Sequence, residues 1–371
     1  MIVSDDDLAA VVATYRSGWL SMGPQTEVLE SAFAEYTGAK HALAVANGTA
    51  GLHLICAATG LRPGDEVVVP SMTFVASVNA IAYTGATPVF ADVASVTEPW
   101  LSAASVEAVL TPRTRAVMQV AYAGHSGETE ALAALCSDRS LTLLEDAAHA
   151  AGSRLKGRHL GTFGLASAFS LFSNKNLAVG EGGLVVTDDD DVAAQVRLLR
   201  SHGMTTMSWQ RHKGHATSYD VVALGYNYRL DEPRAALARN RLGRLDAENA
   251  QRGALDARYR DALSGHDVLC ALEPVDELQS AHHLFTIVLP EGTDRDAFRA
   301  SLAERRVQTS VHYPPSHRFS IYEGEHGPLD VTEAYGDRTV TLPLFAHMTE
   351  QQQDLVTDAV SHALTPRTRA A

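Results

Sequence analysis

A single lysine stands at the end of an apolar run and before a glycine-rich turn. Residues 169–183 read Phe-Ser-Leu-Phe-Ser-Asn-Lys-Asn-Leu-Ala-Val-Gly-Glu-Gly-Gly, with Lys175 at the centre. Of the 30 basic residues in the chain, only Lys40, Lys156, Lys175 and Lys213 are lysines. A primary amine can lose its proton and form a Schiff base, which a guanidinium cannot do. Lys175 is therefore a candidate for covalent cofactor binding, although a lysine in a turn is more often a solvated surface residue.

Two further patterns favour chemistry at this lysine. The run Leu-Thr-Leu-Leu-Glu-Asp over 141–146 ends in Asp146 and leads into a helical pattern. A parallel strand places such a carboxylate at its C-terminal end, where open α/β sheets bind ligands. The stretch 47–51, Asn-Gly-Thr-Ala-Gly, opens another helical pattern, so its backbone amides can face an anion. Pyridoxal 5′-phosphate (PLP) requires a lysine, a carboxylate beside its ring nitrogen and a phosphate site, so it is the first cofactor to test.

These motifs resemble those of the DegT/StrS-type nucleotide-sugar aminotransferases, which are fold-type I PLP enzymes of the aspartate aminotransferase superfamily. The resemblance covers nearly the whole chain. It rests on Asn47-Gly-Thr-Ala50, Pro70-Ser-Met-Thr-Phe74, Glu145-Asp-Ala-Ala-His149, Phe169-Ser170, Lys175-Asn176, Gly180-Glu-Gly-Gly183, Gly225-Tyr-Asn-Tyr-Arg229 and Ser310-Val-His-Tyr-Pro314.

The resemblance implies a role for each matching residue. Lys175 becomes the Schiff-base lysine, Asp146 the partner of the ring nitrogen, and His149 the group near the ring hydroxyl. These three are the expected catalytic residues. The residues expected to hold the cofactor are Thr49, Ala50 and Ser170 at the phosphate, Phe74 on the ring, Asp146, His149, Lys175, and Asn227 reaching the phosphate of the neighbouring subunit. The residues expected to bind substrate are Tyr122, Lys213, Arg229, His312 and Tyr313.

Composition limits the class of protein. The 371 residues are 46% hydrophobic and 20% charged, as in ordinary globular proteins with more than one domain. A formal charge of −14 argues against a nucleic-acid or anionic-membrane partner. No apolar run approaches the roughly 18 residues of a membrane span, and no signal sequence begins the chain, so we expect a cytoplasmic protein. The three cysteines are widely spaced and indicate neither a disulfide framework nor a zinc site.

Residues 201–225 contain His202, His212 and His215, together with Arg211 and Lys213. Histidines this close raise the possibility of a metal site, but no cysteine or acidic ligand accompanies their spacing. A loop that contacts an anionic substrate and a plain solvated loop are the two alternatives. We expect no metal.

Apolar segments alternate with helical patterns along most of the chain. Strands are expected near 67–70, 87–93, 115–122, 141–146, 166–172 and 184–187, and a short apolar segment at 42–46 precedes the helical pattern that starts near 47–51. The fold class is α/β, and the resemblance implies a large PLP-binding domain over 1–240 with a mostly parallel seven-stranded sheet flanked by helices. A smaller C-terminal α+β domain is expected over 241–371.

The expected elements of the smaller domain begin with a long connecting helix through Ala238, Leu242, Leu245, Leu255 and Tyr259. A strand at 281–290, a helix at 294–306 and a strand at 308–313 follow. The last element is a helix that starts at a capping box, Thr349-Glu-Gln-Gln352.

The resemblance implies an aminotransferase that works in two halves. It takes an amino group from L-glutamate and passes it to a keto sugar carried on a nucleoside diphosphate. Tyr122-Ala-Gly124 favours amination at C4 of a 4-keto-6-deoxyhexose, and the shared-site family architecture implies a homodimer. A 3-keto-sugar or cyclitol (scyllo-inosose) aminotransferase and a non-catalytic PLP-binding regulator are the alternatives.

Overall fold

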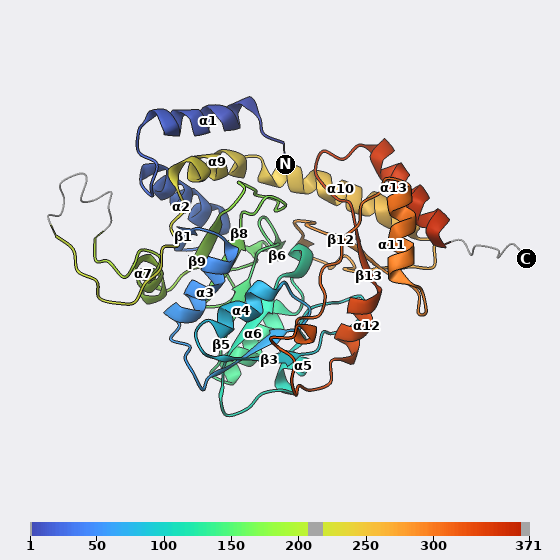
Figure 1. The fold of residues 1–371 in the computed structure, drawn as a ribbon, viewed down its shortest axis with the longest axis horizontal. Coiled ribbons are helices and arrows are strands. Elements are labelled where there is room, and N and C mark those ends of the chain that lie inside the picture. The colour runs from blue at the N-terminus through green and yellow to red at the C-terminus, as the bar shows by residue number, and fades with distance from the viewer. Residues whose placement is uncertain (1, 207–217, 365–371) are drawn as a thin grey trace, which may run out of the picture.

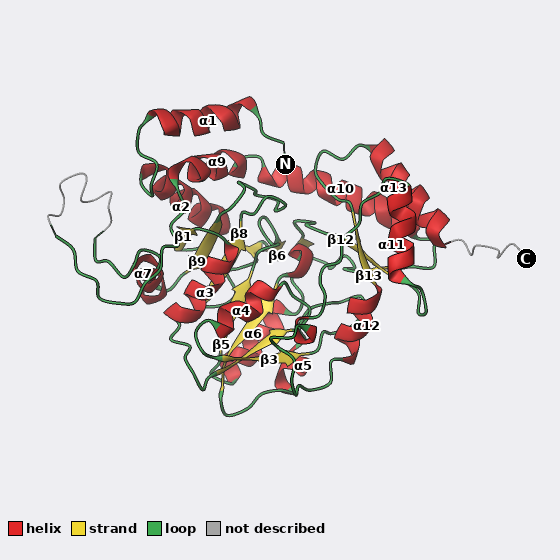
Figure 2. Cartoon of the chain, viewed as in Figure 1, coloured by secondary structure: helices red, strands yellow, loops and turns green. Residues whose placement is uncertain are grey.

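A seven-stranded sheet with helices on both faces forms the largest part of the computed structural model, which describes residues 2–206 and 218–364 (Figures 1 and 2). The strand order is β1-β9-β8-β5-β4-β2-β3, and of these strands only β9 runs antiparallel to its neighbours. The strands are β1 (His41–Val45), β2 (Glu66–Pro70), β3 (Thr87–Ala91), β4 (Thr114–Val120), β5 (Thr142–Asp146), β8 (Ala166–Ser170) and β9 (Gly183–Thr187). The predicted α/β fold with a mostly parallel seven-stranded sheet is confirmed.

Burial explains the apolar character of these strands. β2 reads Glu-Val-Val-Val-Pro and is buried along its whole length, as expected of a central parallel strand covered on both faces. The helices that accompany the sheet are α1 (Asp5–Arg16), α2 (Pro24–Thr37), α3 (Gly48–Ala58), α4 (Val75–Ala82), α5 (Ala103–Glu107), α6 (Thr129–Asp138), α7 (Asp190–Leu199) and α9 (Glu232–Leu242). A small sheet formed by β6 (Arg154–Leu155), β7 (Arg158–His159) and β11 (Leu278–Gln279) lies outside the main one.

Glu232, in the first turn of α9, caps the N-terminus of α2. Its carboxylate accepts hydrogen bonds from the backbone amides of Gly23 (2.8 Å), Gln25 (2.7 Å) and Thr26 (2.9 Å), and from the Thr26 hydroxyl (2.7 Å). The first amides of a helix have no partner within the helix, and they carry its positive dipole end. One buried carboxylate therefore satisfies the start of α2 and joins it to α9.

A second core lies in the C-terminal part of the chain. A three-stranded antiparallel sheet there has the order β10-β12-β13. The strands of this sheet and the helices of the same part of the chain are α10 (Leu245–Leu263), β10 (Leu269–Cys270), β12 (Phe285–Val288), α11 (Arg295–Glu304), α12 (Asp330–Arg338), β13 (Thr339–Leu342) and α13 (Glu350–Leu364). α13 begins at the expected capping box, since Thr349 and Gln352 each accept the other's backbone N–H.

Two expectations for this region are wrong. The predicted strand at 308–313 forms only one bridge, Ser310 to Thr341, because the chain then turns away from the sheet and His312 Nδ1 bonds to the Thr341 hydroxyl at 2.9 Å. The predicted long helix is two helices, α9 and α10, which are separated at Gly243 and Arg244. The sequence patterns of α12 and β13 were not recognised.

α10 contributes to both cores. Leu245 at its start packs in the cluster of Leu29, Phe33 and Phe169, whereas Tyr259 packs with Phe285 in the C-terminal cluster. This arrangement supports a division of the chain near the start of α10, and we propose the boundary at residue 240 on that ground. No helix within residues 2–206 and 218–364 is both long enough and apolar enough to cross a membrane.

Candidate active site

A cavity of about 450 Å³ opens at the C-terminal ends of β1, β2, β4, β5 and β8. Its volume lies in the range of about 300–1,000 Å³ that is typical of small-molecule sites. Six of the residues expected at the cofactor line it, and so do two of those expected at the substrate. These eight are Thr49, Phe74, Asp146, His149, Ser170, Lys175, His312 and Tyr313.

Asp146 is the last residue of β5 and is buried at the base of the cavity. Its Oδ2 accepts a hydrogen bond from the Ser77 hydroxyl at 2.6 Å, and its Oδ1 accepts one from the Ala148 amide at 3.0 Å. Burial raises the pKa of Asp146, while these two hydrogen bonds and the charge of Lys175 oppose that rise. A cationic ring N–H placed beside Asp146 would supply the partner that favours its carboxylate form.

Lys175 lies in the turn that follows β8, where its side chain is half-buried and lines the cavity. Burial lowers the pKa of Lys175 to about 8, although the negative charge of Asp146 acts in the opposite direction. About half of an amine with this pKa is deprotonated at pH 8, whereas a surface lysine, with a pKa of about 10.4, remains almost fully protonated. The amine of Lys175 is therefore suited to act as a nucleophile and as a proton carrier.

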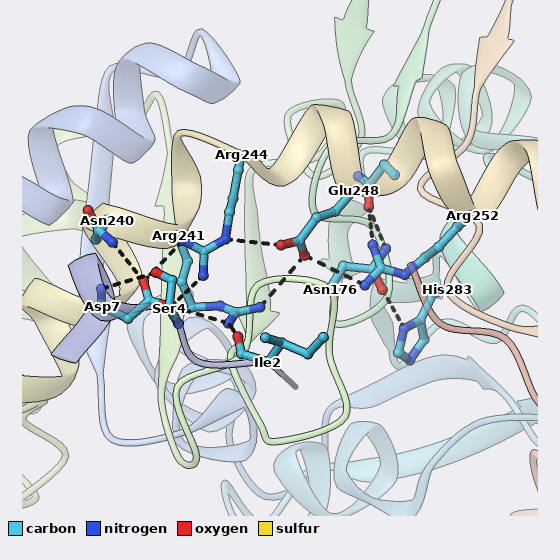
Figure 3. Close-up of polar contacts among 11 residues, drawn as sticks. Ile2, Ser4, Asp7, Asn176, Asn240, Arg241, Arg244, Glu248, Arg252 and His283 are labelled. Atoms are coloured by element: carbon cyan, nitrogen blue, oxygen red, sulfur yellow. Dashed lines mark hydrogen bonds and ion pairs between the residues drawn. The ribbon is translucent and has the colours of Figure 1, made fainter. Parts of the chain in front are cut away.

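Asn176 fixes the backbone beside Lys175. Its side-chain amide donates to the carbonyl of Ala281 (2.7 Å) and to Asn249 Oδ1 (2.8 Å), and its own Oδ1 is 2.9 Å from His283 Nδ1. All of these contacts are buried. Figure 3 shows Asn176 and His283 at one end of a row of polar side chains along α10.

The row of polar side chains ends at α1. Arg252 is 4.0 Å from Glu248, which accepts from Arg244 at 3.0 Å, and Arg244 pairs with the buried Asp7 of α1 at 2.5 Å (Figure 3). The turn that carries Lys175 is thus attached through α10 to the N-terminal helix.

His149 is held as a neutral imidazole with a defined tautomer. The backbone N–H of Ala123 donates to His149 Nδ1 at 3.2 Å, so the ring proton lies on Nε2, which is 2.9 Å from the hydroxyl of Tyr313. Burial, followed by the positive charge of Lys175, lowers the pKa of His149 well below its ordinary value. Because the Tyr313 oxygen accepts from His149, the hydroxyl hydrogen of Tyr313 is free to point elsewhere, including into the cavity.

The opposite end of the cavity has the features of an anion site. Gly48 and Thr49, at the start of α3, line it beside Ser170. A side chain at Gly48 would place its Cβ 2.9 Å from the Cβ of Ser170, so only glycine allows the helix to come this close. Amides and hydroxyls at a helix N-terminus fit a phosphate group. The cavity therefore fits PLP, with Asp146 and Lys175 at one end and this anion site at the other.

Four described residues that were expected at the site do not line the cavity, namely Ala50, Tyr122, Asn227 and Arg229. The Ala50 amide donates to Asn47 Oδ1 at 2.8 Å and caps α3. Tyr122 is completely buried, and its hydroxyl donates to the carbonyl of His312, so it supports the cavity wall from behind. Arg229 is half-buried near the exposed Asn227, in a turn outside the cavity of its own subunit. Lys213 lies outside the described residues.

Sequence reasoning missed Ser77, Thr73 and Glu181. Ser77 bonds to Asp146, and its hydroxyl lies 2.8 Å from that of Thr73. The spacing of four between Thr73 and Ser77, at the start of a helix after a strand, was a signal that could have identified them.

Within the described parts of the chain, no group of three His, Cys, Asp or Glu side chains is arranged to hold a metal ion, and His212 and His215 lie outside those parts.

Known proteins share this architecture over the full length. Residues 2–361 match the model of the DegT/DnrJ/EryC1/StrS aminotransferase family. The aminotransferase TlmJ from Streptoalloteichus hindustanus is 34% identical, with 98% of this chain and 97% of that chain covered and a TM-score of 0.92. DesV from S. venezuelae, solved in complex with a ketimine intermediate, is 36% identical, with 97% and 94% covered and a TM-score of 0.89.

A third structure, DesI in the presence of its TDP-sugar product, is 32% identical, with 97% of this chain and 90% of that chain covered and a TM-score of 0.87. Aminotransferases of the matching family use PLP. The length of the match and these identities lead to one conclusion: this chain belongs to the DegT/DnrJ/EryC1/StrS aminotransferase family.

Proposed function

We propose that this aminotransferase transfers the amino group of L-glutamate to C4 of a nucleoside-diphosphate 4-keto-6-deoxyhexose. The observation that carries the proposal is the placement of Lys175, Asp146 and the α3 N-terminus around one cavity. Two relatives support the nucleotide-sugar class, since DesI was solved with its TDP-sugar product and DesV with a ketimine intermediate.

The described side chains divide the chemistry between them. PLP supplies, when bound, an electron sink for bond changes at the carbon that carries nitrogen. We assign to Lys175 Nζ the covalent attachment of the cofactor and the movement of the proton between carbon and nitrogen, because burial brings its pKa to about 8. Asp146 would keep a proton on the ring nitrogen of the bound cofactor, and His149, at 2.9 Å, orients the Tyr313 hydroxyl so that it could donate to an oxygen atom of a molecule bound in the cavity.

The charge of the substrates supports a second part of the proposal, a homodimer with shared active sites. Glutamate carries two carboxylates and the acceptor carries a diphosphate, yet Lys175 is the only cationic side chain among the described residues that line the cavity. Asn227 and Arg229 lie on a turn outside the cavity, next to Leu224, whose side chain is 95% exposed. We propose that this turn enters the partner's site, where Arg229 meets an anionic group and Asn227 meets the phosphate.

One feature favours C4 over C3. The segment Tyr122-Ala-Gly124 resembles that of family members that act at C4, and the buried Tyr122 holds the carbonyl of His312 at the cavity wall. A 3-keto sugar differs only in the position of the reacting carbon, and a cyclitol lacks the diphosphate. The anion-binding capacity proposed for Arg229 therefore separates nucleotide sugars from scyllo-inosose.

A substrate panel tests the proposal. The PLP-loaded protein receives L-glutamate with thymidine- or uridine-diphosphate 4-keto-6-deoxyglucose, the matching 3-keto sugar, or scyllo-inosose. NMR locates the new amine. We expect amination at C4 of the nucleotide sugar, with the unlinked keto sugar far poorer because nucleotide binding positions the reacting carbon. Amination at C3 would overturn the regiochemistry, and amination of the cyclitol alone would overturn the nucleotide-sugar class.

A further inference from the structure

A buried serine, a histidine and a glutamate form a hydrogen-bonded chain beside the active site. The hydroxyl of Ser71 is 2.7 Å from His317 Nδ1, and His317 Nε2 is 3.2 Å from Glu333 Oε1. The backbone N–H of His317 also donates to the Ser71 oxygen at 3.1 Å, so the Ser71 hydrogen points to Nδ1. The proton of neutral His317 therefore lies on Nε2 and faces Glu333.

This order of groups is that of a hydrolase triad, but Ser71 has no access to a substrate. The side chains of Ser71 and His317 are buried, with exposed fractions of 0% and 4%. The Ser71 oxygen already accepts the His317 N–H and donates to the His317 ring. A nucleophile needs an exposed oxygen and a neighbouring oxyanion site, so the chain of hydrogen bonds has a different role.

The chain of hydrogen bonds joins two segments that line the cavity, the wall that carries Phe74 and the wall that carries Tyr313. Ser71 follows β2 and precedes Thr73 and Phe74, which line the cavity. His317 lies in the short helix η2 (Ser316–Arg318), which follows Tyr313, another lining residue.

Two backbone-linked contacts strengthen this junction. The Ser316 amide donates to the Ser71 carbonyl at 2.8 Å, and the Ser316 hydroxyl donates to the Thr73 carbonyl at 3.2 Å. The rings of Phe74 and Tyr313, which both line the cavity, lie side by side with centroids 5.7 Å apart and planes tilted by 51°.

We propose that Ser71 and His317 are positioning residues that set the separation of the Phe74 and Tyr313 walls, and with it the fit of the keto-sugar acceptor. The Ser71 to His317 contact is the effective link, since both groups are buried and few alternatives could satisfy them. Glu333 stands at the outer end of this series of hydrogen bonds, and its side chain is 46% exposed. Water can therefore take its place as the partner of His317 Nε2. The acceptor part of the inference rests on the proposed function, whereas the positioning part does not.

Two amide substitutions separate the two contacts of His317. The Oδ1 of asparagine takes roughly the place of Nδ1, so His317→Asn keeps an acceptor for Ser71. Glutamine places its amide near Nε2, so His317→Gln keeps the contact to Glu333 and loses the one to Ser71. Ser71→Ala removes the same contact from the other side and also removes the acceptor of the His317 backbone N–H. Glu333→Gln is the matched control.

Hydrogen exchange of the PLP-loaded protein gives a readout that needs no substrate. In His317→Gln and Ser71→Ala we expect faster exchange in peptides that cover 71–77 and 310–319, with unchanged exchange over 141–149. The kcat/KM for the keto-sugar acceptor should fall on the order of 10-fold or more, mainly through KM, because the walls no longer hold their separation. His317→Asn and Glu333→Gln should stay close to the parent protein in both measurements.

If exchange becomes faster and kcat/KM falls equally in His317→Asn and His317→Gln, the Ser71 contact has no special role and the inference is overturned. Unchanged exchange in His317→Gln would overturn it as well, and this variant serves if Ser71→Ala fails to fold. If the acceptor is not a nucleotide sugar, the parent protein fails the substrate panel while the exchange result still tests the positioning role.

Discussion

Replacing Asp146 with asparagine should separate cofactor binding from catalysis. Asparagine has the same shape, so Oδ1 can still accept the Ala148 amide, and the Ser77 hydroxyl can rotate to accept from the new NH₂ group. The fold and the cavity should therefore persist, and PLP should still bind. What disappears is the negative charge that keeps a proton on the ring nitrogen in a buried site.

The magnitude follows from the burial of this charge. A preorganised electrostatic contact that stabilises developing charge in a water-excluded site contributes about 3 kcal/mol. Its loss corresponds to a decrease in kcat on the order of 10²-fold. The carboxylate also raises the pKa of Lys175, so in the apoprotein the variant should lower that pKa below its value of about 8.

The assay is rapid-mixing absorbance of the reaction with L-glutamate alone, after the PLP content of parent and variant has been matched. Ser77→Ala is the control, because it removes one hydrogen bond to Asp146 and leaves the charge in place. It should lose much less activity than Asp146→Asn. Near-normal turnover in Asp146→Asn with full PLP content would refute the reasoning and show that another group holds the ring nitrogen.

Further predictions concern the lysine, the dimer and the fold. Borohydride reduction and peptide mapping should label Lys175; a label on another lysine contradicts the assignment. The rate of covalent PLP capture by apoprotein should rise with pH and level off above about 8, whereas an ordinary lysine would keep rising beyond pH 10. Lys175→Ala and Asn227→Ala proteins should regain activity as mixed dimers, and absence of rescue despite subunit exchange contradicts site sharing. Glu232→Ala should lose roughly 3 kcal/mol in urea unfolding, because buried amides lose their acceptor; an unchanged midpoint contradicts this.

The sequence predicted the part of the site that lies at strand ends. Asp146 and Ser170 end buried strands, and Thr49 begins a helix after another one. Parallel strands bring their C-terminal ends to one edge of the sheet, so local patterns of strand, turn and helix indicated Asp146 and the turn at 47–51 beside Lys175. The roles expected for Thr49 and Ser170 came from the family resemblance. The same logic predicted six of the seven strands of the sheet as apolar segments between helical patterns and the seventh as a short apolar segment.

The other wall of the site depends on contacts between residues far apart in sequence. Tyr313 reaches His149 across 164 positions and Ser71 reaches His317 across 246, and no local period encodes either contact. The segment at 308–313 was predicted as a strand, but the side chains of His312 and Tyr313 are held by Thr341 and His149 instead of a continued ladder. Tertiary contacts decided its conformation.

This asymmetry has a consequence for specificity. The wall of strand ends holds the groups that every PLP-dependent amino transfer needs, namely an amine, a carboxylate and an anion site. We propose that the wall at 310–318 meets the substrate. Tyr313 ties this wall to His149, whereas its other residues contact Met72, Ser71 and Thr73 instead of the groups around Lys175. We therefore expect that changes in the segment outside Tyr313 can alter the acceptor while the chemistry at Lys175 persists. Exchanging residues 310–319, with Tyr313 retained, for those of a relative with a different acceptor should shift acceptor preference and leave the rate with L-glutamate alone within a few-fold; equal losses in both half-reactions would show that the two walls do not act separately.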